Sequence, residues 1–209
     1  MTARSFLLAT ALAPLLLAGP AQELVAQGNA AWRAKRPEEA VLLYQKALAL
    51  RPDSPEALYD LGAALYRMGD FTRALDNFER AARLRQRGRV AALARYNAGN
   101  SAFQQGLALV YSDPRGALSM MEHAIDSYRE ALRLEASLRD ASHNAEVVKK
   151  WLRLLEQHFA QQQSQGASSG PPFPGQGPGN TVQGILGQDA RSRSGAGLKA
   201  RPPAVEKDW

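Results

Sequence analysis

Small and aromatic residues recur at an interval of 34 residues in the first part of the chain. The first copy holds Gly28, Ala40, Tyr44 and Ala47, and the second holds Gly62, Ala74, Phe78 and Ala81. A unit of this length cannot bury its own apolar face, so successive units must stack and share a core. The period therefore predicts an all-α chain of stacked helical pairs.

Each recurring position has a packing reason. We expect the glycines to lie where the two helices of one pair approach closely, and Tyr44 and Phe78 to fill the space between successive pairs. The sequence Gly69-Asp70-Phe71 predicts a turn between helices, and Pro37 and Pro55 suit the first turn of a helix.

A third copy carries an insertion. Gly99 and Ala124 occupy the positions of Gly62 and Ala74, but 25 residues separate them instead of 12. The extra 13 residues, 107–119, predict a first helix lengthened through Tyr111, a turn at 112–114 and an early start of the second helix. Asp113 before Pro114 favours a break there.

A last amphipathic helix is expected from Asp140 to about Gln161. Val148, Leu152, Leu155 and Phe159 recur at helical spacing, so this helix can cover the exposed end of the stack. The predicted domain spans 22–160, with repeats 21–54, 55–88 and 92–138 and a capping helix at 139–160.

The period and the helical pattern resemble the tetratricopeptide repeat (TPR), which implies a right-handed α-solenoid of three helix pairs plus the capping helix. A finer resemblance is to the Bat-type (aerotolerance operon) TPR family. It is carried by the YNAGN sequence of Tyr96–Asn100, by Asn144 and Glu146 in the last helix, and by the glutamines that follow Gln157. This resemblance implies an envelope protein that works beside von Willebrand factor A domain membrane proteins and a MoxR-type ATPase, in stress tolerance or in maturation of an exported enzyme.

The first residues have the pattern of a secretory signal peptide. Arg4 precedes an apolar run from Phe6 to Ala18, and Gly19 and Ala21 fit a cleavage site, so residues 1–21 are expected to be removed and the protein to be periplasmic, or membrane-peripheral. The alternatives are a short uncleaved anchor, or an apolar helix packed on the domain. With a retained N-terminal helix, the protein would be a structural factor associated with the membrane surface.

Catalytic signals are weak. The chain has no cysteine and a formal charge of +6 spread along its length, and it contains no phosphate loop or nucleophile elbow, so we expect no enzyme, no cofactor, no metal and no nucleic-acid partner. His123, His143 and His158 are expected to be surface or packing residues. Five arginines between Arg80 and Arg89 fit either an acidic or lipid partner or, preferably, the C-terminal end of a helix.

The first helices of the pairs are expected to line a concave groove that docks a peptide or a partner protein. The predicted groove residues are Asn29, Trp32, Arg33, Tyr59, Tyr66, Arg67, Tyr96, Asn100, Phe103, His143 and Asn144. The carboxylate clamp of chaperone-binding TPR domains is not expected, because only Asn29 matches its pattern. A further alternative is an accessory domain of an enzyme.

Residues 161–209 are expected to form a disordered tail. Between 160 and 209 the chain places 9 of its 17 glycines and 6 of its 12 prolines, a composition that cannot build a core. Asp208 and Trp209 in the last segment form a second candidate contact for a partner, beside a plain disordered end.

Overall fold

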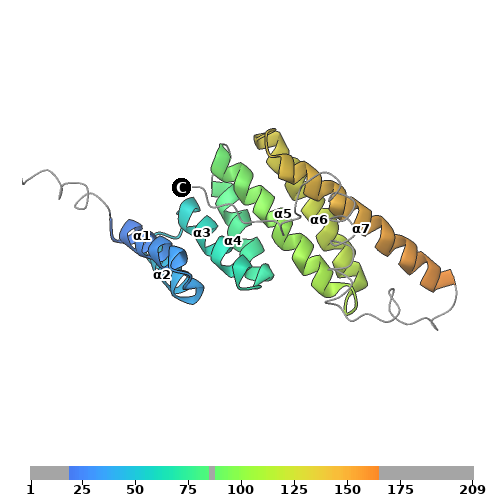
Figure 1. Ribbon diagram of the computed structural model, residues 1–209, viewed down its shortest axis with the longest axis horizontal. Coiled ribbons are helices and arrows are strands. Elements are labelled where there is room, and N and C mark those ends of the chain that lie inside the picture. The colour runs from blue at the N-terminus through green and yellow to red at the C-terminus, as the bar shows by residue number, and fades with distance from the viewer. Residues whose placement is uncertain (1–18, 85–87, 165–209) are drawn as a thin grey trace, which may run out of the picture.

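The computed structural model describes residues 19–84 and 88–164, and all regular structure in this part of the chain is α-helical. Seven helices follow one another in a row (Figure 1). They are α1 (Pro20–Arg33), α2 (Pro37–Leu50), α3 (Pro55–Arg67), α4 (Phe71–Leu84), α5 (Arg89–Leu109), α6 (Pro114–Leu134) and α7 (Arg139–Ser164). Each helix packs mainly against its sequence neighbours, which is the antiparallel stacking expected of a helical solenoid. The predicted fold class is confirmed.

Proline and glycine define where several helices begin and end. Proline occupies the first turn of α1, α2, α3 and α6, where its missing N–H costs no hydrogen bond. Between α3 and α4 the chain turns through Gly69 at φ +82°, a backbone conformation that residues with a side chain rarely adopt. The turn predicted at Gly69-Asp70-Phe71 is therefore present, with Phe71 as the first residue of α4.

The insertion in the third pair is divided between both helices. The helices α5 and α6 have 21 residues each, whereas α3 has 13 and α4 has 14. The helix α5 ends at Leu109 and α6 begins at Pro114, close to the expected break. Because both partners are lengthened by about two turns, they still cover each other along their full length.

A glycine and an aromatic ring meet inside every pair. A Cβ added to Gly28 would lie 2.5 Å from the Tyr44 ring, and one added to Gly99 would lie 2.7 Å from the Tyr128 ring. Gly62 and Phe78 form the third such contact. The close helix approach at the glycines is confirmed. Tyr44 and Phe78 each cover the glycine of their own pair, and both belong to the core cluster that the first two pairs share with α5.

The buried apolar residues form two clusters. One joins the first two pairs to the N-terminal half of α5, and the other joins α5, α6 and α7. Leu75 and Leu138 pack against both clusters, so the stack has a continuous core. The helix α7 extends to Ser164, three residues beyond the predicted end at Gln161.

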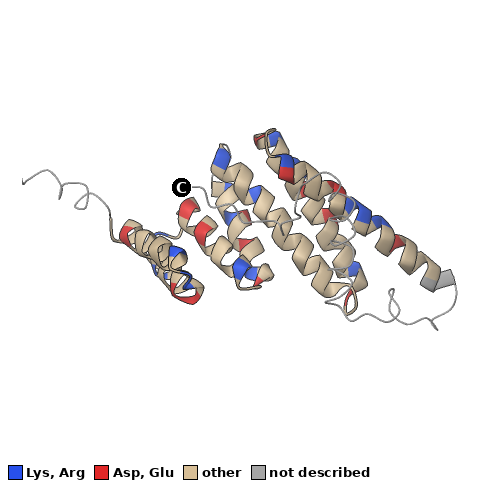
Figure 2. Cartoon of the chain, in the orientation of Figure 1, with Lys and Arg blue, Asp and Glu red and all other residues tan. Residues whose placement is uncertain are grey.

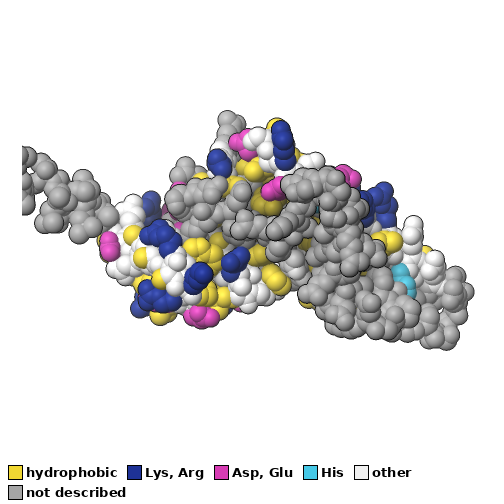
Figure 3. Space-filling view, in the orientation of Figure 1, with side chains coloured by type: hydrophobic (Ala, Val, Ile, Leu, Met, Phe, Trp, Pro, Cys, Tyr) yellow, Lys and Arg dark blue, Asp and Glu magenta, His cyan; other side chains and the backbone are white. Residues whose placement is uncertain are grey.

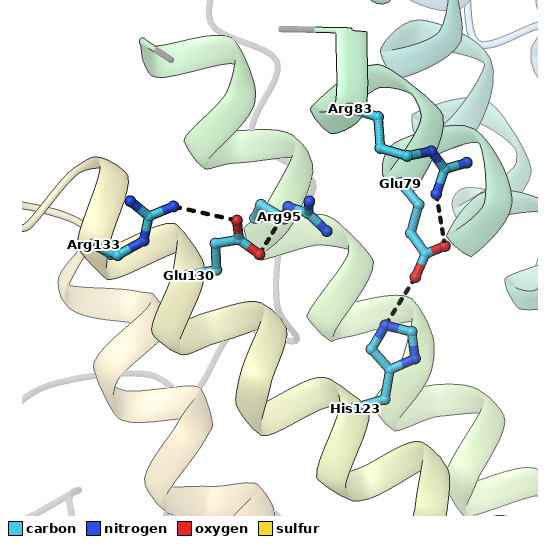
Figure 4. Close-up of polar contacts among 6 residues, drawn as sticks. All are labelled: Glu79, Arg83, Arg95, His123, Glu130 and Arg133. Atoms are coloured by element: carbon cyan, nitrogen blue, oxygen red, sulfur yellow. Dashed lines mark hydrogen bonds and ion pairs between the residues drawn. The ribbon is translucent and has the colours of Figure 1, made fainter. Parts of the chain in front are cut away.

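Glu79 and Glu130 form polar contacts between helices at the surface of the stack (Figure 4). Glu79 of α4 accepts a contact from His123 of α6 at 2.8 Å and pairs with Arg83 at 3.4 Å. Glu130 of α6 bridges Arg95 of α5 at 3.2 Å and Arg133 at 3.4 Å. His123 is therefore a surface packing residue, as expected from the sequence. Acidic and basic residues are interspersed among uncharged ones along the helices (Figure 2).

The parts of the chain that bear on export lie largely outside the described residues. Of the predicted signal peptide, only residues 19–21 are described, and Gly19 is the residue that precedes α1. Within 19–84 and 88–164 no helix combines the length and the apolar character needed to cross a membrane.

Candidate protein-interaction face

The first helices of the pairs lie on the inner side of the stack. The helices α1, α3, α5 and α7 contact one another in turn, whereas α2, α4 and α6 make no backbone contacts with each other in the described part of the chain. The first helices are thus closer together than the second helices, which makes their side the concave one. We call it the first-helix face.

The predicted groove residues differ in their exposure on this face. Arg33 and Arg67 are exposed, and five others are half-buried: Asn29, Trp32, Tyr66, His143 and Asn144. Tyr59 and Asn100 are completely buried, and Tyr96 and Phe103 are only 5% and 7% exposed. The expectation that all these positions are exposed is therefore wrong for the last four, while their contact with a partner stays a prediction.

Hydrogen bonds between repeats explain why two tyrosines turn inward. The amide of Asn97 donates to the Tyr59 hydroxyl at 2.8 Å, and the amide of Asn144 donates to the Tyr96 hydroxyl at 3.3 Å. In both cases a tyrosine at the same repeat position is held by an asparagine of the next first helix. Tyr59 and Tyr96 therefore join α3 to α5 and α5 to α7.

Asn100 is the centre of this buried network. Its Oδ1 accepts the Tyr128 hydroxyl at 2.8 Å and the Asn144 amide at 3.0 Å, and its amide donates to Asn97 at 3.2 Å. Burial, and to a smaller extent the neighbouring Tyr96, raise the pKa of Tyr128 well above its ordinary value. The network is satisfied and neutral, so it fixes the relative positions of four helices, α3, α5, α6 and α7.

The same pairing occurs in the first repeat and is replaced as a unit in the second. The Tyr44 hydroxyl donates to Asn29 Oδ1 at 2.7 Å, as Tyr128 donates to Asn100. The second repeat has Ala63 and Phe78 at these two positions, so hydroxyl and amide are lost together. Because both partners are replaced, no buried polar atom is left without a hydrogen bond, and the free-energy cost of such an atom is avoided.

Tyr66 is a half-buried aromatic residue of the first-helix face. Its ring packs edge-on against Phe71 at 5.3 Å between centroids. Burial raises the pKa of Tyr66 to about 12, the nearby Tyr96 adds to this, and a hydrogen bond with Gln104 opposes it. The phenol is therefore neutral at physiological pH and can donate or accept a hydrogen bond.

Phe103 and Trp151 close the face between α5 and α7. Their rings meet edge-on at 6.4 Å, and Trp151 is 3% exposed. Val148 and Leu155 of the predicted apolar stripe are buried, whereas Leu152 and Phe159 are only half-buried, and the prediction does not include Trp151. A stripe through Val148, Trp151 and Leu155 has the same helical spacing and is the one that faces the core.

A pocket of about 300 Å³ lies at one end of the face. It is formed by the start of α5 and the α6–α7 connection, with Leu93, Tyr96 and Leu138 among the lining residues. Two arginines and two carboxylates also line it: Arg89, Arg139, Glu135 and Asp140. The pocket is thus polar and of mixed charge.

The arginine run does not form one helix end. Arg80 pairs with Asp76 at 3.7 Å and Arg83 pairs with Glu79, both near the C-terminus of α4. Arg89 is instead the first residue of α5, where the helix dipole disfavours a cation. Arg85 and Arg87 lie outside the described residues, as do Asp208 and Trp209 and the rest of the predicted tail from 165 onward.

Stacked antiparallel pairs with an inner face of first helices define an α-solenoid repeat protein. Two family sequence models match the chain. The model described as "TPR repeat" matches residues 28–69, and the model described as "Tetratricopeptide repeat" matches residues 55–87. Over residues 28–87 the chain is thus similar to tetratricopeptide repeats.

Solved structures share this fold. The first TPR domain of Spaghetti (RPAP3), bound to the HSP90 peptide SRMEEVD, is 22% identical at a TM-score of 0.53, over 64% of this chain and 93% of that one. The N-terminal domain of stress-induced protein-1 from C. elegans is 19% identical at a TM-score of 0.50, over 68% of this chain and 99% of that one. No curated protein sequence matches the chain.

Proposed function

We propose that this protein is an interaction scaffold that binds an extended segment of a partner protein along the first-helix face. The observation that carries the proposal is the row of half-buried polar side chains on successive first helices, Asn29, Tyr66, Gln104 and Asn144. Asn29 and Asn144 also form hydrogen bonds inside the stack. Amides and a neutral phenol can pair with a peptide backbone in any sequence. The RPAP3 domain, which has the same fold, is seen bound to a peptide.

Site-specific photocrosslinking in cells that produce the protein tests this proposal. A photoreactive residue at Arg33, Gln104 or His143 places the probe on the first-helix face, whereas one at Lys46 or Arg129 places it on the second helices as a matched control. We expect a crosslinked partner from the first three positions only. Equal crosslinking from all five positions would contradict the proposal, as would crosslinks from the controls alone.

The identity of the partner and the location of the protein form the finer part of the proposal. The YNAGN and Asn144 motifs support an envelope protein that works with von Willebrand factor A domain membrane proteins and a MoxR-type ATPase. Asn97, Asn100 and Asn144 also have a packing role in the buried network, so these motifs serve the fold as well. Crosslinked partners identified by mass spectrometry would include a von Willebrand factor A domain protein if the proposal is correct.

Export can be tested separately at the N-terminus. We propose that residues 1–21 are removed and that the mature protein is periplasmic. Mass spectrometry of the protein from fractionated cells would then find no peptide from residues 1–21 in the periplasmic form. Met1 retained in the membrane fraction would favour the membrane-surface alternative.

A further inference from the structure

We infer that the segment bound on the first-helix face is acidic, with two carboxylate side chains about three residues apart that meet Arg33 and Arg67. This inference rests on the proposed function and names the chemistry of its partner. It concerns carboxylates within the segment, because the positions of the chaperone-type clamp hold Val25, Asp60, Leu93 and Asn97, which do not build a site for a terminal carboxylate.

Arg33 and Arg67 occupy the same place in two successive repeats. They are 34 residues apart, and each is the last residue of a first helix, α1 or α3. Both side chains are exposed, and α1 and α3 contact each other. Two equivalent arginines thus end successive first helices, and these helices lie on the concave side of the stack.

Neither arginine has an acidic partner among the described residues. The arginines of the second helices, in contrast, are mostly paired: Arg73 with Asp70, Arg80 with Asp76, Arg83 with Glu79, Arg129 with Asp126 and Arg133 with Glu130. Most arginines of the second helices are therefore neutralised by nearby carboxylates of the same chain, whereas Arg33 and Arg67 of the first helices can pair with carboxylates of a partner. Figure 3 shows basic side chains interleaved with hydrophobic ones over α1–α4.

The surroundings of the two arginines suit a bound chain. Asn29 lies one turn before Arg33 on the same side of α1, and Tyr66 precedes Arg67. Arg33 follows Trp32, another half-buried aromatic residue of the face, as Arg67 follows Tyr66. The carboxylate of Asp60 on α3 is buried at 2% exposure.

The spacing of the carboxylates follows from the helix spacing. Axes of packed helices are about 8–10 Å apart. A chain in the extended polyproline II conformation rises about 3.1 Å per residue and brings a side chain back to the same face every three residues. An extended segment that crosses α1 and α3 therefore advances about three residues between the two arginines. Guanidinium groups can hold carboxylates through two parallel hydrogen bonds, which makes arginine well suited to this task.

Selection from a random peptide library tests the inference. The peptides are displayed as internal segments without a free carboxyl terminus, and the full chain is immobilised. We expect the selected peptides to be enriched in Asp and Glu, in pairs about three residues apart. Their capture should weaken as salt concentration rises.

Charge reversal identifies the residues responsible. The variant Arg33→Glu with Arg67→Glu should select peptides enriched in Lys and Arg, and Arg33→Gln with Arg67→Gln should select peptides with no charge preference. The control Arg115→Glu with Arg153→Glu reverses two exposed arginines elsewhere and should keep the acidic preference. Far-UV circular dichroism checks that every variant is folded.

The outcomes separate the two proposals. Selected peptides without an acidic preference, or an acidic preference that survives reversal of Arg33 and Arg67, would overturn this inference and leave the scaffold proposal intact. A further variant alters the first-helix face by His143→Glu with Gln104→Glu. If peptide binding is unchanged both in this variant and in the variant with Arg33 and Arg67 reversed, the proposed function is overturned as well.

Discussion

At the residue scale, the contact between Gly99 and Tyr128 leaves no space for a side chain. A methyl group on Gly99 would lie 2.7 Å from a ring that is fully buried. We expect Gly99→Ala to destabilise the protein by about 1–3 kcal/mol through overpacking, although alanine returns up to about 1 kcal/mol of helix propensity. Urea denaturation followed by circular dichroism measures the difference.

Gly106→Ala is the matched control on the same helix. Its added methyl would meet Ala117 and Met120 at 3.2 and 3.3 Å, contacts that a small shift can relieve. The variant should therefore cost less than Gly99→Ala. A larger cost at Gly106 would show that the glycine–aromatic contact is not the tight point of the pair.

The Asn29–Tyr44 pair offers a second test, because the second repeat already contains its apolar replacement. Asn29→Ala alone removes the acceptor of a hydroxyl on a fully buried ring, at a cost of about 1–3 kcal/mol. Adding Tyr44→Phe recreates the Ala63 and Phe78 combination and should recover part of that cost. A double-mutant cycle in urea measures the coupling between the two sites, and simple additivity would contradict the interpretation.

Individual residues also show where sequence reasoning succeeded and where it failed. The 34-residue period located Gly28 and Gly62 correctly, because the need for a small residue at a helix crossing does not depend on the neighbouring pair. It did not reveal that Tyr59 and Tyr96 are buried, because their hydroxyls are bound by asparagines of the next repeat. The insertion concealed the correspondence between Asn29–Tyr44 and Asn100–Tyr128, which are separated by 15 and 28 residues.

At the scale of the element, α6 depends on its N-cap. Asp113 Oδ1 accepts the backbone N–H of Gly116 at 3.0 Å and so satisfies one of the free amides of the first turn. Asp113→Ala should therefore destabilise the protein by about 1 kcal/mol. Asp126→Ala, which removes an exposed carboxylate from the middle of the same helix, should cost less in the same urea experiment.

Helix boundaries were predictable where proline or an Asp-Pro step defines them. Asp113-Pro114 and Pro55 mark real helix starts, and the division of the insertion between α5 and α6 followed from the first of these. The assignment of Arg89 to a helix end was wrong, because arginine has no strong positional preference and Gly88, at φ +89°, begins a new helix. The end of α7 was placed three residues early, since glutamines propagate a helix without an apolar signal.

At the scale of the whole molecule, stability should increase from the first pair inward. The helix α1 buries only Gly28 and Ala31 and α2 buries three residues, whereas α3 buries every residue from Ala57 to Leu65. Because a solenoid is stabilised by nearest-neighbour contacts, the poorly covered end opens first. Hydrogen exchange measured by mass spectrometry should show faster exchange in α1 and α2 than in α3 and α5. Uniform protection across the chain would mean that the stack opens as one unit.

The unequal helix lengths give the stack a direction. A helix rises about 1.5 Å per residue, so the 21 residues of α5 extend about 12 Å further than the 13 of α3. An array of identical repeats offers a ligand the same surface at every step, and a ligand can slide along it by one repeat. Here the step in height between the second and third pairs occurs once in the described stack, so we expect a bound segment to favour one alignment over the others.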